Sequence, residues 1–154
     1  MSNINMSSPI LMNCVFTNNI TAGVGGGLYN FNESSPTLTN CSFNNNSANY
    51  GGGILSNNMC SLAFTDCAFS GNTASSSGGG FYQFSGSQAS LSNCSILNNS
   101  AQGFGGGINS FGDMTIIDCL IDGNQAPNAG GIFLGSGILE MTNTIVSNNH
   151  TTFQ

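Results

Sequence analysis

The residues of this chain whose side chains could do chemistry are six cysteines, six acids and one histidine. Thiols could hold a metal or form disulfides, paired carboxylates could hydrolyse a glycosidic bond, and histidine could transfer a proton. Five of the cysteines recur at a nearly fixed interval, at Cys14, Cys41, Cys67, Cys94 and Cys119, and Thr144 takes the next place. The steps are 27, 26, 27, 25 and 25 residues, which is the mark of a repeat architecture.

The same interval governs the residues around each cysteine. An apolar residue follows two places later and an asparagine three places after that, in every unit. Asn or Asp precedes the cysteine column, and a glycine run with an apolar residue behind it closes the first five units. The asparagine column consists of Asn19, Asn46, Asn72, Asn99, Asn124 and Asn149. A pattern repeated along the whole chain indicates a repeat fold, whereas the residues of an active site usually occur once in a sequence.

Each unit predicts two or three strands of three to five residues, bounded by Asn or Gly. No segment carries the i, i+3, i+4, i+7 apolar stripe of a helix. A parallel β-helix requires such a register, because each coil lies about 4.8 Å from the last and places like residue on like. We therefore expect an all-β solenoid of about five to six coils over residues 1–154. The coils fall roughly at 9–40, 41–66, 67–93, 94–118 and 119–143, with a partial coil at 144–154, and the solenoid is either whole or a segment of a longer one.

Alternation along the repeat assigns each column a place. Leu38 is expected to face inward, Asn40 to form a bend at positive φ, and Cys41 and Phe43 to face inward again. Stacked asparagine amides hydrogen-bond from coil to coil, so the asparagine column is predicted to form a ladder. The cysteine column is predicted to hold core thiols, with disulfides between neighbouring coils as the alternative. Cys60 stands off this column and is expected to be the free or cross-linked thiol.

The candidates for catalysis have structural interpretations. Asp66 and Asp118 share a column about 10 Å apart, slightly beyond an inverting glycosidase pair, and Asn93 between them indicates a bend position rather than an acid. His150 lies near the end of the chain without triad partners in its vicinity. The glycine runs lack the context of a phosphate-binding loop, and a linear row of thiols does not suit zinc. We predict no catalytic residue, no metal site and no cofactor, and hence no enzyme.

The FxxN steps FNNN (43–46) and FSGN (69–72), with GGGI (51–54) one bend later, resemble the repeats of the chlamydial polymorphic membrane proteins. The resemblance covers roughly residues 9–149, in five or six copies. It implies a right-handed parallel β-helix displayed on a cell surface, commonly adhesive and carried by an autotransporter. The chain differs in having Gly where that family prefers Ala in the glycine motif.

The composition of the chain disfavours several classes of binding partner. The chain has no Lys or Arg and a net charge of −6, so nucleic acid and direct membrane insertion are not expected. No stretch predicts a signal peptide or a membrane helix, and a secretion signal would have to lie outside this sequence. Of eight Asn-x-Ser/Thr sequons, Asn5, Asn32, Asn45 and Asn98 are the candidate glycosylation sites, because they fall in loops or just before the ladder.

These observations predict a structural, extracellular β-helix at the cell surface, a subunit or segment of a fibre or appendage that assembles through its open coil ends. The expected partner is a second copy, end to end or side by side. The alternatives are an adhesin passenger that binds a glycan or a host surface protein and, less favoured, a carbohydrate-active enzyme. Against the adhesin, no repeated aromatic array is seen at the outward positions Met12, Thr39, Thr65, Ser92, Ile117 and Thr142.

Overall fold

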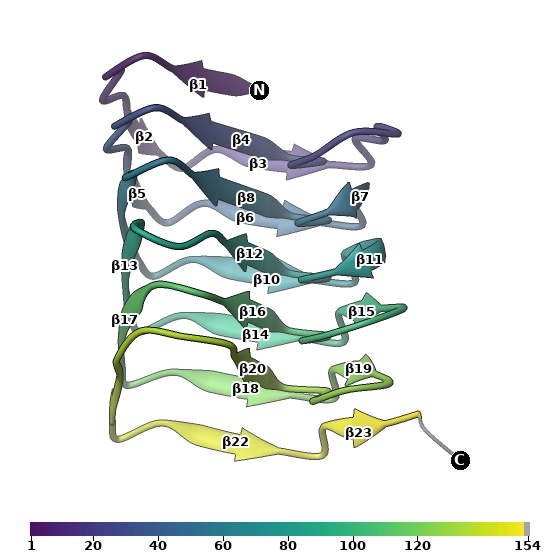
Figure 1. Ribbon diagram of the computed structural model, residues 1–154. Helices are drawn as coiled ribbons and strands as arrows, with labels where there is room; N and C mark the ends of the chain where they lie inside the picture. The colour runs from purple at the N-terminus through teal and green to yellow at the C-terminus, as the bar shows by residue number, and fades with distance from the viewer. Residues whose placement is uncertain (153–154) are drawn as a thin grey trace.

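The computed structural model describes residues 1–152, which form six stacked coils built of strands and turns (Figure 1). Every strand pairs in parallel with the equivalent strand of the next coil, so the predicted parallel β-helix is confirmed. A complete coil contributes four strands, one to each of four sheets, rather than the two or three expected. No helix able to cross a membrane occurs among residues 1–152.

The four sheets follow one another around each coil. Sheet A consists of β1 (Ser2–Ile4), β4 (Leu28–Phe31), β8 (Ile54–Asn57), β12 (Phe81–Gln83), β16 (Ile108–Ser110) and β20 (Ile132–Leu134). Sheet B consists of β2 (Ile10–Met12), β5 (Thr37–Thr39), β9 (Ser61–Thr65), β13 (Gln88–Ser92), β17 (Asp113–Ile117) and β21 (Leu139–Thr142). Sheet C consists of β3 (Val15–Thr17), β6 (Ser42–Asn44), β10 (Ala68–Ser70), β14 (Ser95–Leu97), β18 (Leu120–Asp122) and β22 (Ile145–Ser147).

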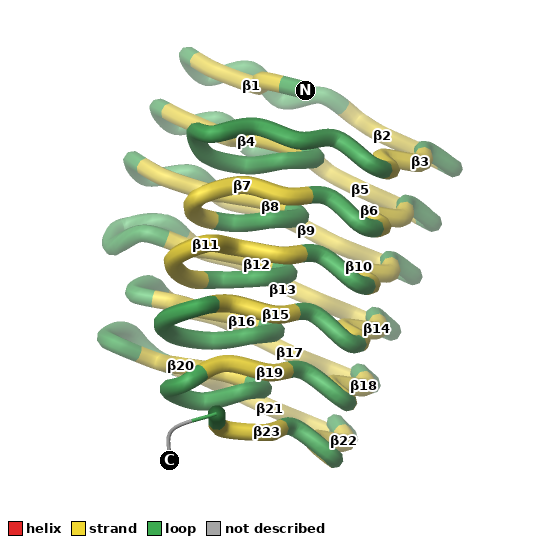
Figure 2. Tube along the Cα trace, turned by 90° about the vertical axis from the view of Figure 1, so that its right-hand side faces the viewer, coloured by secondary structure: helices red, strands yellow, loops and turns green. Residues whose placement is uncertain are grey.

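Sheet D is the strand set that the repeat pattern did not separate. It consists of β7 (Ser47–Tyr50), β11 (Thr73–Ser77), β15 (Ser100–Ala101), β19 (Gln125–Ala126) and β23 (His150–Thr151). In Figure 2 these strands and the turns that lead from them back to sheet A face the viewer. Small alanines, Ala74, Ala101 and Ala126, fill the narrow space behind them.

The core consists of columns of like residues in register. In sheet C, Phe43 pairs with Phe16 on one side and Phe69 on the other, and the rings stack with centroids 4.7 and 5.3 Å apart. In sheet B, Leu38 pairs with Phe64 in the same way. These interior side chains are essentially inaccessible to water, which is the main source of stability in a rod this narrow.

A single residue in the left-handed region turns the chain from sheet B to sheet C. The residues at this corner have φ between 50° and 55°, and they are Asn13, Asn40, Asp66, Asn93, Asp118 and Asn143. Asn and Asp tolerate this conformation better than other residues with a Cβ. The bend expected at Asn40 is therefore present in every coil.

The glycine runs bring neighbouring coils close together on their way from sheet D to sheet A. Gly78 opens one run at φ 68°, and the next residue, Gly79, lies so near the adjacent coil that a Cβ there would clash with the carbonyl oxygen of Gly106. A side chain of any size would force the coils apart at this point.

Candidate functional site

The six predicted ladder asparagines lie one above another along the rod. The backbone N–H and Nδ2 of Asn72 both donate to Oδ1 of Asn99, each at 2.9 Å, and Nδ2 also donates to the carbonyl of Phe43 at 2.8 Å. The same bonds recur in the other coils, with Nδ2–Oδ1 distances of 2.8–3.0 Å. The interior members, from Asn46 to Asn124, are at most 1% exposed. Each interior amide thus satisfies a backbone N–H and a backbone carbonyl of the preceding coil and donates to the amide oxygen of the next coil.

The ladder has a direction, and its two ends differ chemically. Asn19 donates twice to Asn46, but among residues 1–152 nothing donates to its own Oδ1. At the other end Asn149 accepts from Asn124 and donates from Nδ2 to the carbonyl of Ile121, while its backbone N–H and the second Nδ2 hydrogen have no acceptor in the described chain. Within residues 1–152, the first ladder member therefore has an unpaired acceptor and the last has unpaired donors.

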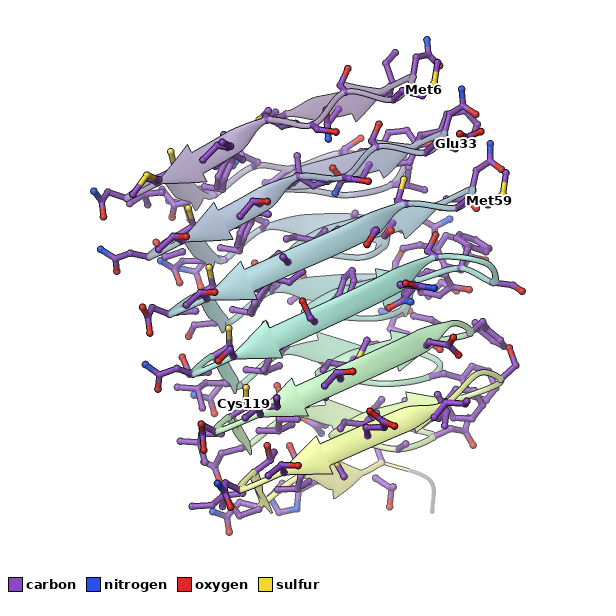
Figure 3. The ribbon with its side chains drawn as sticks, turned by 90° about the vertical axis from the view of Figure 1, so that its left-hand side faces the viewer. Met6, Glu33, Met59 and Cys119 are labelled. Carbon is purple, nitrogen blue, oxygen red and sulfur yellow. The ribbon has the colours of Figure 1, made fainter. Side chains whose placement is uncertain are left out.

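All six cysteines are free thiols in the described structure. Four members of the cysteine column belong to the hydrophobic core and Cys14 packs against it; Cys119 is labelled in Figure 3. Each Sγ donates to the carbonyl two residues earlier, at 3.1–3.3 Å. Shared hydrogen bonds with Cys119 and Cys67 raise the pKa of the Cys94 thiol far above its usual range, and the bond with Cys94 lowers the pKa of Cys67 and Cys119 to about 7.

Cys60 is a free thiol, one of the two outcomes expected for it, and it is buried in the rod. It is 1% exposed, its Sγ donates to the carbonyl of Asn57 at 3.0 Å, and burial raises the pKa of its thiol. In equivalent turns Ser7 and Ser34 donate to the carbonyl three residues earlier. The column Ser7, Ser34, Cys60 and Ser87 keeps the steps of 27, 26 and 27 residues, so the signal was present in the sequence.

The candidate glycosylation sites fall into two kinds of turn. Asn32 donates from Nδ2 to Asn5 Oδ1 at 3.0 Å and accepts from Asn58 at 2.9 Å, which makes a short outer ladder beside Met6, Glu33 and Met59 of Figure 3. Asn45 and Asn98 are exposed at the turn before the buried ladder, both with φ 54°, and within residues 1–152 their side chains make no hydrogen bond. These two side chains are the freer acceptors for a glycan.

The residues considered for catalysis remain apart. Asp66 and Asp118 occupy exposed corner positions, and Asp66 accepts a hydrogen bond from Asn93 of the next coil. His150 is exposed in the last strand. In the described chain, no three His, Cys, Asp or Glu side chains come close enough together to hold a metal ion.

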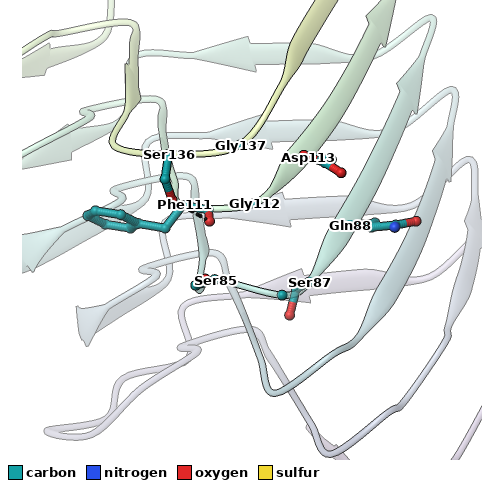
Figure 4. A pocket seen from close by; sticks show the side chains of 9 residues that line it. Ser85, Ser87, Gln88, Phe111, Gly112, Asp113, Ser136 and Gly137 are labelled. Carbon is teal, nitrogen blue, oxygen red and sulfur yellow. Dashed lines mark hydrogen bonds between the residues drawn. The ribbon is translucent and has the colours of Figure 1, made fainter.

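A hollow of about 290 Å³ lies at the turns between sheets A and B, and sequence reasoning did not find it. Figure 4 shows Ser85, Ser87, Gln88, Phe111, Asp113 and Ser136 around it. Asp113 is its one acid, and Asp113 Oδ1 accepts from the N–H of Ile138 at 2.9 Å. Its chemistry is limited to a single carboxylate already engaged with the backbone.

An aromatic strip covers the outer side of sheet A. It consists of Tyr29, Phe31, Tyr50, Tyr82, Phe84, Phe104, Phe111 and Phe133. The outward positions for which no aromatic array was expected all lie in sheet B, and they hold no aromatic residue, whereas sheet A was not considered. The signal was the recurrence of Tyr or Phe two and four residues into the strand after a glycine run, as in LYNF (28–31).

A family model described as the right-handed β-helix region matches residues 3–153. The chain belongs to the right-handed β-helix family. Neither curated proteins nor solved structures gave a match. The family accounts for the coils, the corners and the core of this β-helix, while its function has to be inferred from its own surfaces.

Proposed function

We propose that this β-helix is a structural, extracellular module of a surface fibre or appendage and assembles end to end with further copies. The observation that carries the proposal is the complementarity of the ladder ends. The unpaired N–H groups of Asn149 in one copy match the unpaired Oδ1 of Asn19 in the next, as Asn124 and Asn149 match within one copy.

Apolar surface at the two ends supports the same proposal. Met141 and Val146 are each 48% exposed, whereas their equivalents one coil earlier, Ile116 and Ile121, are completely buried. At the opposite end Phe16 presents one face of a ring whose other face stacks on Phe43. Stacking two copies would continue these columns and remove apolar area from water.

A seam of this kind joins unlike ends. An interface between two different patches of identical subunits leaves the second pair of patches free, so it extends into an open filament unless the rotation closes a ring. When one copy stacks on another as coils stack within a copy, the two copies are related by the small twist between successive coils. Such a small rotation favours a straight fibre over a closed ring. The rod would then have a donor end and an acceptor end.

The test measures the size of the assembly and identifies which ends of two copies meet. Purified protein is examined by sedimentation and electron microscopy over a range of concentrations, and the variant Thr144→Cys is treated with a short bis-maleimide. Residues 14 and 144 lie five coils apart within one copy, about 24 Å, too far for the linker. A head-to-tail seam yields peptides joined between residues 14 and 144 of different copies. The wild type, which has threonine at position 144, is the control and should yield no such peptide.

Two results would contradict the proposal in different ways. A chain that stays monomeric at every concentration does not assemble. Filaments that give only 14–14 and 144–144 products assemble through like ends. Asn149→Asp is expected to weaken assembly, because it keeps the acceptor for Asn124 and replaces the outward donor by an acceptor. Asn98→Asp adds the same charge on the side of the rod and should assemble normally.

We also propose that the chain is not an enzyme and needs no cofactor, which the structural roles of Asp66 and Asp118 at corners support. The surface setting rests on the resemblance to the polymorphic membrane protein repeats and on a polar surface free of cationic residues. Of the alternatives, the adhesin is favoured by one observation, the aromatic strip.

A further inference from the structure

Aromatic residues gather on one outer face of the rod. Eight of the thirteen described aromatic side chains belong to the aromatic strip, and the other five fill the core. The strip faces outward because the strands alternate: Phe81 and Gln83 on either side of Tyr82 point into the rod and are at most 1% exposed. On sheet B the equivalent outward positions hold small polar residues such as Ser90 and Thr115.

Contacts between rings join six of the eight members, and Tyr29 and Phe31 form a separate pair with centroids 5.9 Å apart. Centroids lie 5.4 Å apart between Tyr50 and Tyr82, 6.2 Å between Tyr82 and Phe111, and 6.2 Å between Phe111 and Phe133. Phe104 continues the series, 4.6 Å from Phe133, and is 40% exposed. Tyr82 is 6% exposed, and Leu55, which pairs with it in the neighbouring strand, is 1% exposed, so a ligand would contact the other rings of the strip, Phe104 above all.

Polar groups without charge accompany the rings. All three tyrosines of the chain lie in the strip, and Asn109 is in register between Tyr82 and Phe133. Asn109 is 1% exposed and its Oδ1 has no hydrogen-bond partner within residues 1–152. No charged residue occupies the strand positions of sheet A that form this face. The surface thus combines apolar faces with hydroxyl and amide groups.

We propose that the aromatic strip binds a neutral polysaccharide chain that lies along the rod. The apolar faces of sugar rings pack on aromatic rings, and sugar hydroxyls pair with tyrosine hydroxyls and amides. Five coils give a strip of about 20 Å, long enough for several sugar units. A net charge of −6 without any cation disfavours an anionic glycan, and it equally disfavours a second rod lying side by side on the same strip. This site is separate from the coil ends and does not depend on their assembly.

The composition of the chain provides a specific readout. With no Trp and with every Tyr in the strip, intrinsic tyrosine fluorescence reports on this surface alone. The protein is titrated with cellohexaose and with chitohexaose, and with polygalacturonate as the anionic comparator. We expect a saturable fluorescence change with at least one neutral oligosaccharide and none with polygalacturonate.

Three variants make the test specific. Phe104→Ala should raise the dissociation constant about tenfold, and Phe104→Tyr should preserve binding, because it keeps the ring. Ile117→Ala is the matched control, since Ile117 is a similarly exposed apolar residue, 38%, on sheet B, and it should change binding less than twofold. Circular dichroism verifies that each variant folds.

The proposal is overturned if neither neutral oligosaccharide changes the fluorescence, if polygalacturonate binds as well, or if Ile117→Ala weakens binding as much as Phe104→Ala. It is also overturned if Phe104→Ala lowers the sedimentation coefficient in the absence of sugar, because the strip would then join two rods. None of these results bears on the cross-linking pattern at the coil ends.

Discussion

The side-chain nitrogen of Asn72 donates to Oδ1 of Asn99, 27 residues later, at 2.9 Å, and both side chains are shielded from water. The same Asn99 oxygen also accepts from the backbone N–H of Asn72. The amide oxygen of Asn99 therefore satisfies both a backbone donor and a side-chain donor of the neighbouring coil, in a region that water does not reach. Buried polar groups that lose such partners are costly, so the ladder sets how strictly the coils must stay in register.

Removing one interior ladder amide should be severe. In Asn72→Ala, both donors of Asn46 lose their acceptor and the Phe43 carbonyl loses its donor, while Asn99 Oδ1 keeps only the backbone N–H of residue 72. We expect the free energy of unfolding to fall by about 3 kcal/mol or more, measured by chemical denaturation. Asn44→Ala is the control, because this half-buried side chain makes no hydrogen bond in the described chain. Equal losses for the two variants would contradict a structural role for the ladder.

A methyl group at the close approach of two coils should also destabilise the rod. Gly79→Ala places a Cβ against the carbonyls of Gly106 and Ser100, which belong to the adjacent coil's backbone and cannot rotate away. The expected loss is about 1–3 kcal/mol in the free energy of unfolding. Gly23→Ala should change it by no more than about 0.5 kcal/mol, because the nearest atom to its Cβ would be Thr21 Oγ1 at 3.5 Å. If both alanines are tolerated, the glycine runs are not needed for coil spacing.

Thiol reactivity should separate Cys14 from the other cysteines. Cys14 lies in the first coil and is half-buried, while the remaining five are buried. An aromatic disulfide reagent should modify one thiol rapidly in the native, dilute protein and six in guanidinium. Fewer than six in guanidinium without reductant would reveal disulfides, and fast reaction of Cys60 would contradict its place in the core. End-to-end assembly should slow the reaction of Cys14.

Acid should weaken the last coils through Asp122. Its carboxylate accepts from Ser147 Oγ at 2.6 Å and from Asn148 Nδ2 at 2.7 Å, and these bonds lower the pKa of Asp122. A carboxyl whose pKa is lower in the folded state stabilises the fold above its unfolded pKa of about 4, and this contribution disappears as the pH falls through the folded value. The melting temperature should therefore fall below about pH 4.

The matched variants identify the source of this acid sensitivity. Asp122→Asn should flatten the dependence of the melting temperature on pH between about 5 and 2. Asp118→Asn removes one carboxylate at an exposed corner that accepts no hydrogen bond from residues 1–152, and it is the control for the loss of a negative charge. A steeper slope in Asp122→Asn would mean that the two hydrogen bonds do not stabilise the charged form.

Sequence alone was sufficient for the columns in which one residue type recurs. Asn, Cys and Gly repeat because each has a role that other residues fill poorly: the ladder amide, the small core thiol and the close backbone approach. The burial of residues in sheet A could not be predicted, because the residue type at each position of this sheet changes from coil to coil. Asn30, Ser56 and Gln83 form one column that is buried in the rod, although such residues read as outward positions in a sequence.

The outer side of the same sheet was missed for the same reason. Tyr29, Leu55, Tyr82, Asn109 and Phe133 succeed one another in register, and Leu55 and Asn109 interrupt the recurrence of aromatic residues that would mark a column. Both sides of sheet A are largely buried, so the rule of inward apolar and outward polar residues fails there. Sheet D escaped notice because its strands are as short as two residues, as in β15 and β19.

The parallel stacking of coils also has a mechanical consequence. Every strand is paired only with the coils above and below it, so each coil is held by its two neighbours and by nothing farther away. Tension applied at a chain end would load only the outermost coil, which would unravel while the next one stays wound. Each event would release about 90 Å of slack, the extended length of one repeat. A filament of such rods would lengthen in equal steps under tension, one coil at a time, and so absorb mechanical energy before it breaks.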